Sequence, residues 1–207
     1  MGRSDFSCEI NGVTLEYVDE THQYLADGIL VPSITQIVRY RFCGKYDNVS
    51  PRVLQAAAER GTEIHESIER LVCEGIRDDR EEVRNFEFLQ KAHGFGAVNA
   101  EIPVILFDDA LGYPIAAGRI DLVLTKRVFE KPILGLADIK CTSALDRMYL
   151  AYQLNLYRLA YQQSYDEQIG FLAGVWLRGE KRKFVDIPIN EDAANDLIHE
   201  YFSEVRQ

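Results

Sequence analysis

The middle of the chain alternates strand-like and helix-like segments in an order that few folds accommodate. Five runs rich in apolar and β-branched residues are typical of buried strands, and helical periodicity separates or follows them. The strand-like runs are residues 100–107, 113–124, 133–140, 169–177 and 183–189. Strands that are apolar on both faces need cover on both faces. The order therefore predicts an α/β domain in which helices flank a central mixed sheet on both faces.

Two tight-turn signals dominate the beginning of the chain. Asn11-Gly12 and Asp27-Gly28 each separate short apolar runs, which is the strongest local pattern for a β-hairpin. Residues 1–32 are therefore expected to form an N-terminal β-meander. Ser33 with Gln36 three positions later has the spacing of a capping box, so a short helix is expected next.

A helical part follows, and it carries His65. Pro51 at a first helical position begins a long helix that is predicted to end near Gly75, and a second helix is predicted over 79–92. In the first of these helices Gly61 and His65 lie on one stripe, where Gly61 would permit close approach to a neighbour. The length of 207 residues favours one domain. We divide it into the meander (1–32), a helical part (33–95) and an α/β core (96–207).

Composition narrows the class of protein. The chain is 47% hydrophobic and 27% charged, and no apolar run approaches the roughly 18 residues of a membrane span. We expect a soluble cytoplasmic protein with no membrane partner. The net charge of -10 disfavours a protein that coats nucleic acid nonspecifically, because such binding depends on neutralised phosphates. The same net charge is compatible with an enzyme whose carboxylates gather in a cleft filled by cations. The four cysteines lack the spacing of a zinc or iron–sulfur site.

Acidic and basic residues interrupt two neighbouring strands of the core. Asp138 and Lys140 are two positions apart and share one strand face, and Asp121 lies in the preceding strand. Two carboxylates brought together there would repel unless a cation lay between them, and hard oxygen ligands suit Mg²⁺ or Mn²⁺. The carbonyl of Ile139 would add a ligand. The metal would lower the pKa of a bound water, and Lys140 would orient the nucleophile or neutralise developing charge on a phosphoryl group.

Each of these patterns also has a structural explanation. Asp138 and Lys140 alone could form a salt bridge at a sheet edge, and a lone histidine such as His65 is often a satisfied core residue. Gln153 and Tyr157 are adjacent on one helix face and could form a half-buried polar stripe.

Together, the motifs resemble the PD-(D/E)XK nuclease superfamily, in the branch of RecB-type and phage-type exonucleases. The resemblance rests on GTEIH, GRIDLV, ADIKCTS and QLNLY in that order, and the opening ETHQYLADGILVPSITQIV also resembles phage-encoded exonucleases and the mitochondrial genome-maintenance exonuclease. It covers about residues 14–160. It implies a restriction-endonuclease-like core and a Mg²⁺ or Mn²⁺ dependent enzyme. Relatives with an iron–sulfur cluster build it largely from late cysteines, and this chain has none after Cys141, so no such cluster is expected.

The resemblance also assigns roles. His65, Asp121 and Asp138 would hold metal, Lys140 would be the catalytic lysine, and Gln153 and Tyr157 would fall on a Gln-x-x-x-Tyr motif that positions DNA or the lysine. These six residues form the expected site. Asp in place of Glu before the Ile-Lys pair shortens one ligand by a methylene and is an accepted variant.

Other residues stay open at this stage. Glu101 is a further candidate ligand, because a one-residue change of strand register decides its face. Arg119 could pair with either acid and hold it ionised. Thr142 and Ser143 could bond phosphate or backbone, or Ser143 could cap the next helix. Two interpretations also remain for Tyr40, Arg41 and Phe42. They could stack on the bases of a DNA strand and neutralise its phosphates, or they could be a surface segment with an aromatic anchor.

Two functions from different classes follow. The first is a metal-dependent deoxyribonuclease, expected to be an exonuclease acting at DNA ends in phage-type recombination, repair or replication. The second is a catalytically idle member of the fold that binds DNA or a partner protein. The partners considered are DNA that is single-stranded or has free ends, a second copy of this chain and a phage recombination protein. A phage-encoded enzyme would act in the bacterial host cell.

Overall fold

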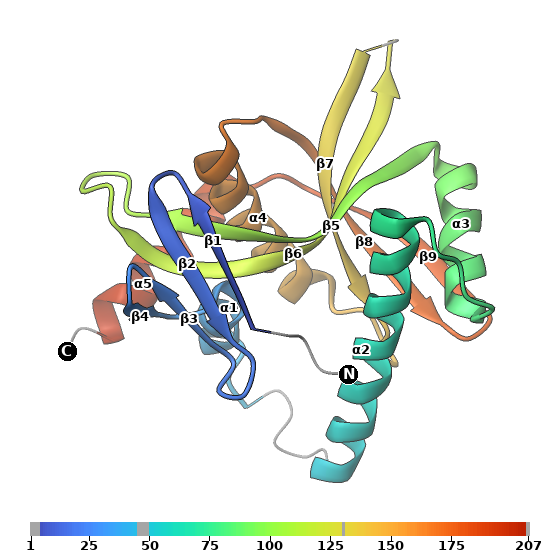
Figure 1. Cartoon of the computed structure of the whole chain (residues 1–207), viewed down its shortest axis with the longest axis horizontal. Helices are drawn as coiled ribbons and strands as arrows, with labels where there is room; N and C mark the ends of the chain where they lie inside the picture. Colours follow the sequence, from blue (N-terminus) through green and yellow to red (C-terminus); the bar gives the residue numbers. More distant parts are fainter. Residues whose placement is uncertain (1–4, 45–49, 130, 206–207) are drawn as a thin grey trace.

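The computed structural model describes residues 5–44, 50–129 and 131–205. It contains two sheets and five helices within those ranges (Figure 1). A four-stranded antiparallel meander comes first. Three helices lead from it to a five-stranded mixed sheet, whose last strands are joined to two further helices.

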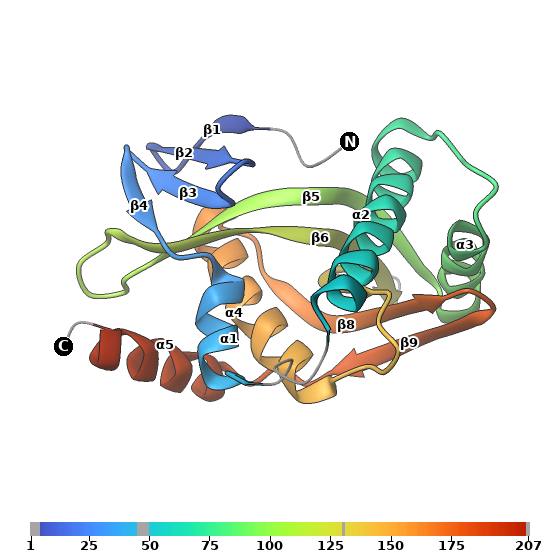
Figure 2. The same cartoon turned by 90° about the horizontal axis from the view of Figure 1, so that it is seen from below.

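The N-terminal meander has the predicted order. It comprises β1 (Phe6–Ile10), β2 (Val13–Val18), β3 (Gln23–Ala26) and β4 (Ile29–Val31). Both predicted turns are confirmed, since Asn11, Gly12, Asp27 and Gly28 all have positive φ as a two-residue hairpin turn of the primed type requires. The meander lies across β5 and β6 in Figure 2, and its core side chains pack with those of the sheet at Ala117.

The larger sheet runs in the order β5-β6-β7-β8-β9. Its strands are β5 (Phe95–Phe107), β6 (Pro114–Val128), β7 (Lys131–Lys140), β8 (Ile169–Arg178) and β9 (Lys181–Ile187). Neighbouring strands are antiparallel except for β7 and β8, which are parallel and joined through a helix. The predicted mixed sheet is therefore confirmed.

Helices cover both faces of this sheet. The short α1 (Ile34–Arg41), the crossover α4 (Arg147–Tyr165) and the last helix α5 (Glu191–Val205) share one apolar core with it. The long α2 (Pro51–Glu74) and α3 (Glu81–His93) share another (Figure 2). The first helix begins with the predicted capping box, in which the Ser33 and Gln36 side chains bond each other's backbone N–H.

Two local predictions need correction, and one open alternative is excluded. The strand predicted from residue 100 begins at Phe95, because Gly94 ends α3 in a left-handed conformation and the chain extends at once. Helix α4 is capped by Asp146, whose carboxylate accepts the Tyr149 N–H, and not by Ser143. Gly61 makes no close approach, since a Cβ built there would meet no atom within 4 Å.

In the part of the chain that the structure describes, no helix is both long and apolar enough to cross a membrane.

Candidate metal and acid–lysine site

The site lies where β6 and β7 separate. The two strands pair from Val128 and Lys131 to Leu122 and Ala137, and no β6–β7 pair follows among the described residues. Beyond that pair, the Ile139 N–H donates to a side chain instead of to the backbone of β6. Its acceptor is Asp121 Oδ2, at 2.8 Å. Regular alternation also fails here. Ile120 and Val123 both join the α4-side core although they are three residues apart. Because of this break, the Asp121 side chain points into the opening between β6 and β7.

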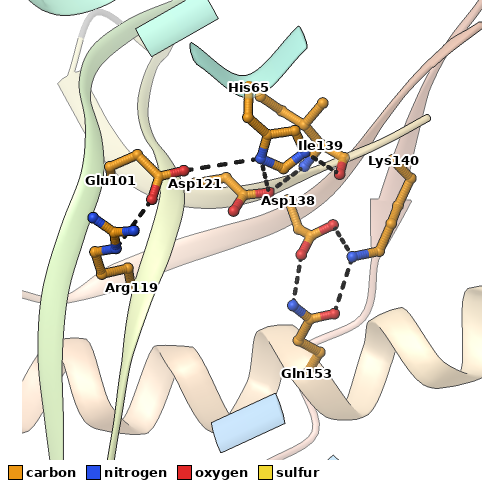
Figure 3. A network of polar contacts seen from close by, with 8 residues as sticks. All are labelled: His65, Glu101, Arg119, Asp121, Asp138, Ile139, Lys140 and Gln153. Carbon is orange, nitrogen blue, oxygen red and sulfur yellow. Dashed lines mark hydrogen bonds and ion pairs between the residues drawn. The ribbon is translucent and has the colours of Figure 1, made fainter. Parts of the chain in front are cut away.

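Helix α2 brings His65 to this opening. Its Nδ1 lies 3.6 Å from Asp121 Oδ2 and 3.8 Å from Glu101 Oε1 (Figure 3). Its Nε2 lies 3.1 Å from the Ile139 carbonyl oxygen, which can only accept. Nε2 therefore donates its proton, and in the neutral ring the Nδ1 lone pair is left facing the two carboxylates.

Strand β5 supplies Glu101 directly opposite Asp121. The register pairs Ala100 with Leu122 and Ile102 with Ile120, which places Glu101 across from Asp121. Glu101 has a φ of 51°, a left-handed backbone that is unusual within a strand for a residue with a side chain. The register question left open by the sequence is thus answered, and the Glu101 side chain is 8% exposed beside the site.

The three side chains fit a divalent cation. One ligand atom each from His65, Glu101 and Asp121 all lie within 4.8 Å of one another. An imidazole nitrogen with two carboxylate oxygens suits Mn²⁺, and Mg²⁺ accepts the carboxylates with water. A backbone carbonyl that accepts the second ring N–H is the usual support of a metal-binding histidine, and the Ile139 carbonyl provides it here.

A second group of three residues adjoins the first. Lys140 Nζ lies 2.6 Å from Asp138 Oδ2 and 3.2 Å from Gln153 Oε1, and Gln153 Nε2 donates to Asp138 Oδ1 at 2.6 Å. The contacts close a ring of acid, amine and amide (Figure 3). Asp138 is almost fully buried, whereas the Lys140 side chain is 25% exposed. Lys140 is therefore held in place by both partners while it keeps access to a molecule in the site.

Two predicted ligands lie apart from the three-residue metal group. The Asp138 carboxylate faces Lys140 and Gln153, and the Ile139 carbonyl faces His65. The salt bridge that the sequence allowed between Asp138 and Lys140 is present, but it is buried rather than at an exposed edge. Metal binding by Asp138 and Ile139 stays a prediction.

Tyr157 packs one helical turn beyond Gln153. A Cβ built on Gly118 in β6 would lie 2.8 Å from the Tyr157 ring. The absence of a side chain at Gly118 therefore allows the ring to pack directly on the β6 backbone. Sequence reasoning placed Tyr157 near the site but missed Gly118. Its one signal was a glycine inside a strand, which often marks close approach.

No protein-family model and no curated protein matches this chain. Among solved structures, the crystal structure of SSO0001 resembles it with a TM-score of 0.45 and 15% sequence identity. The likeness covers 84% of this chain and 75% of that chain.

The charges of the site shift its proton equilibria. Burial raises the pKa of Asp121 to about 6, because nearby carboxylates add to the effect and His65 offsets only part of it. Burial alone would lower the pKa of His65, but Asp121 and Glu101 outweigh it and raise that pKa. The pKa of Lys140 is likewise raised, since Asp138 and Asp121 outweigh its burial. Lys140 is therefore a cation at neutral pH.

The remaining predicted residues lie around this centre. Thr142 Oγ1 donates to the Ala144 carbonyl, and Ser143 is exposed. In α1, Tyr40 donates to Glu204 and Arg41 contacts Tyr152 and Glu200. The ring of Phe42 packs on Tyr149 and Tyr152. These contacts favour the interpretation of this segment as an aromatic anchor within the protein.

Arg119 is engaged by one acid. Its Nε lies 3.3 Å from Glu101 Oε2. Its aromatic neighbours, Phe6 and Tyr17, come from the meander more than 100 positions away. No local pattern in the sequence could identify them.

Proposed function

We propose that this chain is a metal-dependent deoxyribonuclease that hydrolyses phosphodiester bonds with Mg²⁺ or Mn²⁺. One observation carries the proposal: the His65–Glu101–Asp121 group adjoins the Asp138–Lys140–Gln153 ring in the space where β6 and β7 separate. A cation site beside a positioned ammonium suits a substrate whose reacting group is anionic.

We further propose that the chain belongs to the PD-(D/E)XK superfamily with a restriction-endonuclease-like core. The order of the motifs in the sequence supports this assignment. Support also comes from the mixed sheet, in which Asp121 and Asp138 lie on adjacent strands and His65 and Gln153 reach them from helices on opposite faces.

The residues divide the work of the proposed reaction. A bound divalent cation would supply an acidified water and offset charge on a phosphoryl oxygen. Asp121, Glu101 and His65 would hold that cation. Lys140 is kept charged by Asp138, so it would neutralise the charge that develops on the phosphate rather than act as a base. Gln153 fixes the position of the lysine amine through its own bond to Asp138.

The proposed substrate is DNA that is single-stranded or has free ends, and the proposed mode is exonucleolytic. The resemblance to phage-type exonucleases supports a role in recombination, repair or replication in the cytoplasm, within the bacterial host if the chain is phage-encoded. A second copy of this chain or a phage recombination protein would be the corresponding protein partner.

One observation favours the alternative of an idle DNA-binding or protein-binding member. The chain carries a net charge of -10, which repels a long polyanion. Against this alternative, the residues at the metal and lysine positions are all chemically competent.

The deciding experiment measures cleavage of end-labelled single-stranded and double-stranded DNA with Mg²⁺, Mn²⁺ or EDTA. Asp121→Ala and Lys140→Ala are compared with Asp186→Ala, which removes an exposed carboxylate from β9. We expect cation-dependent cleavage by the wild type and Asp186→Ala and none by the two site variants. Silence of the wild type on every substrate would overturn the nuclease proposal, and cleavage that survives in both site variants would identify a contaminant.

A further inference from the structure

Arg119 joins the N-terminal meander to the candidate metal site. It lies in β6 opposite Pro103, diagonally across from Glu101, and its Nε is 3.3 Å from Glu101 Oε2. The Arg119 side chain is 11% exposed, and that of Glu101 is 8% exposed. An ion pair this well buried is poorly screened by solvent, so the attraction between its two charges is stronger than at the surface.

The Arg119 guanidinium also contacts two aromatic rings. Phe6 and Tyr17 are cross-strand partners in β1 and β2, and their rings stack with centroids 5.7 Å apart. The guanidinium carbon lies 5.3 Å from the Phe6 centroid and 5.2 Å from that of Tyr17. Cation–π contacts are stronger at desolvated positions than at exposed ones. The meander therefore restrains the arginine that in turn contacts the glutamate.

Glu101 needs such a restraint. Its backbone is in the left-handed region at φ 51°, a strained conformation that persists only where the surroundings hold it. Its carboxylate also faces the Asp121 carboxylate across the rung, and two like charges repel. Its two oxygens have different neighbours, because Oε2 meets Arg119 whereas Oε1 points to His65 Nδ1.

We infer that Arg119 is a positioning residue for the cation site, through which Phe6 and Tyr17 of the meander hold Glu101 Oε1 toward His65 and Asp121. The inference rests on the proposed function, since it concerns the same site. It makes the meander a working part of that site. Residues that orient the ligands of a metal typically change its affinity about 10- to 100-fold when they are removed.

The test titrates the whole protein with Mn²⁺ and measures binding by electron paramagnetic resonance and calorimetry, without DNA. Arg119→Met removes the charge and keeps an apolar stem. Arg119→Lys keeps the charge but loses the flat group that stacks on the rings. We expect both to weaken Mn²⁺ binding about tenfold or more. Arg158→Met is the matched control, because Arg158 is a 12% exposed arginine paired with Glu191, and it should bind Mn²⁺ like the wild type.

A second pair of variants tests the meander itself. Tyr17→Leu removes the ring under Arg119, whereas Tyr17→Phe keeps that ring and removes only the hydroxyl. We expect Tyr17→Leu to weaken Mn²⁺ binding several-fold and Tyr17→Phe to retain wild-type affinity. Thermal unfolding of each variant identifies those that fail to fold, and Arg119→Lys carries the test if Arg119→Met is among them.

The outcomes separate the two proposals. A wild type that binds no Mn²⁺ removes the cation site, and this inference falls with it. A wild type that binds Mn²⁺ while both Arg119 variants bind it equally well overturns the inference and leaves the proposed function intact. Tighter binding by Arg119→Met would also overturn it, because Arg119 would then act as a charge that repels the metal.

Discussion

Asp121 and Ile139 are joined across a break in the sheet, with the Asp121 carboxylate accepting the Ile139 N–H at 2.8 Å just beyond the last β6–β7 pair. The carbonyl of the same residue accepts the His65 Nε2–H. One backbone position therefore orients both an acid and an imidazole. The opening between the strands is stabilised by these two bonds instead of by a continued ladder.

Asp121→Asn tests the charge of this acid separately from its shape. The amide keeps an oxygen for the Ile139 N–H but contributes no negative charge to a cation. We expect Mn²⁺ affinity to fall at least about a hundredfold, beyond the range typical of residues that only support a ligand. Asp186→Asn is the control and should leave affinity unchanged, since Asp186 is an exposed residue of β9. Near-wild-type affinity in Asp121→Asn would remove Asp121 from the ligand set.

Several features of the site follow from local sequence rules. Asp138 and Lys140 share a strand face because side chains alternate, and they do contact each other. Gln153 lies on the next helix at the level of this pair. The meander turns and the Ser33 capping box were equally predictable, because their backbone geometry depends on a few adjacent residues.

Other features depend on tertiary packing that the sequence does not encode locally. The face of Glu101 depends on the β5–β6 register and on its left-handed backbone, and strict alternation gives neither. The separation of β6 from β7 groups Asp121 with His65 and Glu101, while Asp138 turns to Lys140. The contact of Arg119 with Phe6 joins segments that no periodicity relates.

Gln153→Leu should show that the amide is needed to position Lys140. The change removes the amide that donates to the buried Asp138 Oδ1, so the free energy of unfolding should fall by about 1 to 3 kcal/mol. Asn155→Leu is the matched control on the same helix, because Asn155 is also buried and bonds the backbone at Pro188 and Asn190. Both variants should lose stability, but only Gln153→Leu should lower cation-dependent DNA cleavage by more than about tenfold. Equal activity in the two variants would reduce Gln153 to a structural residue.

Gly118→Ala should be destabilising because its new methyl would lie 2.8 Å from the Tyr157 ring. Overpacking of this kind costs about 1 to 3 kcal/mol. Tyr157→Leu in the same chain should recover part of that loss, which a double-mutant cycle measures by urea denaturation. Gly61→Ala is the control. It places a methyl in open space on α2 and should raise the free energy of unfolding by up to about 1 kcal/mol. Strict additivity of Gly118→Ala and Tyr157→Leu would show that the two positions are not coupled.

Glu82 gives the protein a pH-dependent contribution to stability. Its Oε1 accepts hydrogen bonds from Arg60 at 2.6 Å and from the Gly179 N–H at 3.0 Å, so it joins α2, α3 and the β8–β9 turn. Burial raises the pKa of Glu82, but these two bonds outweigh it and leave the pKa below its usual value.

The sign of the pH effect follows from that lowered pKa. The stabilisation by Glu82 is complete above the pKa of an unfolded glutamate, about 4.3, and is lost as pH falls through the lower folded value. Glu82→Gln should therefore lower the free energy of unfolding by about 1 to 3 kcal/mol at neutral pH. Urea denaturation should show this difference from the wild type shrinking steadily as pH is lowered below about 4. Glu180→Gln, in the exposed β8–β9 turn, should change the free energy of unfolding little at either pH. A Glu82→Gln difference that is constant down to pH values where the wild type begins to unfold would show that the charge of Glu82 contributes nothing, and that its bonds to Arg60 and Gly179 act only through shape.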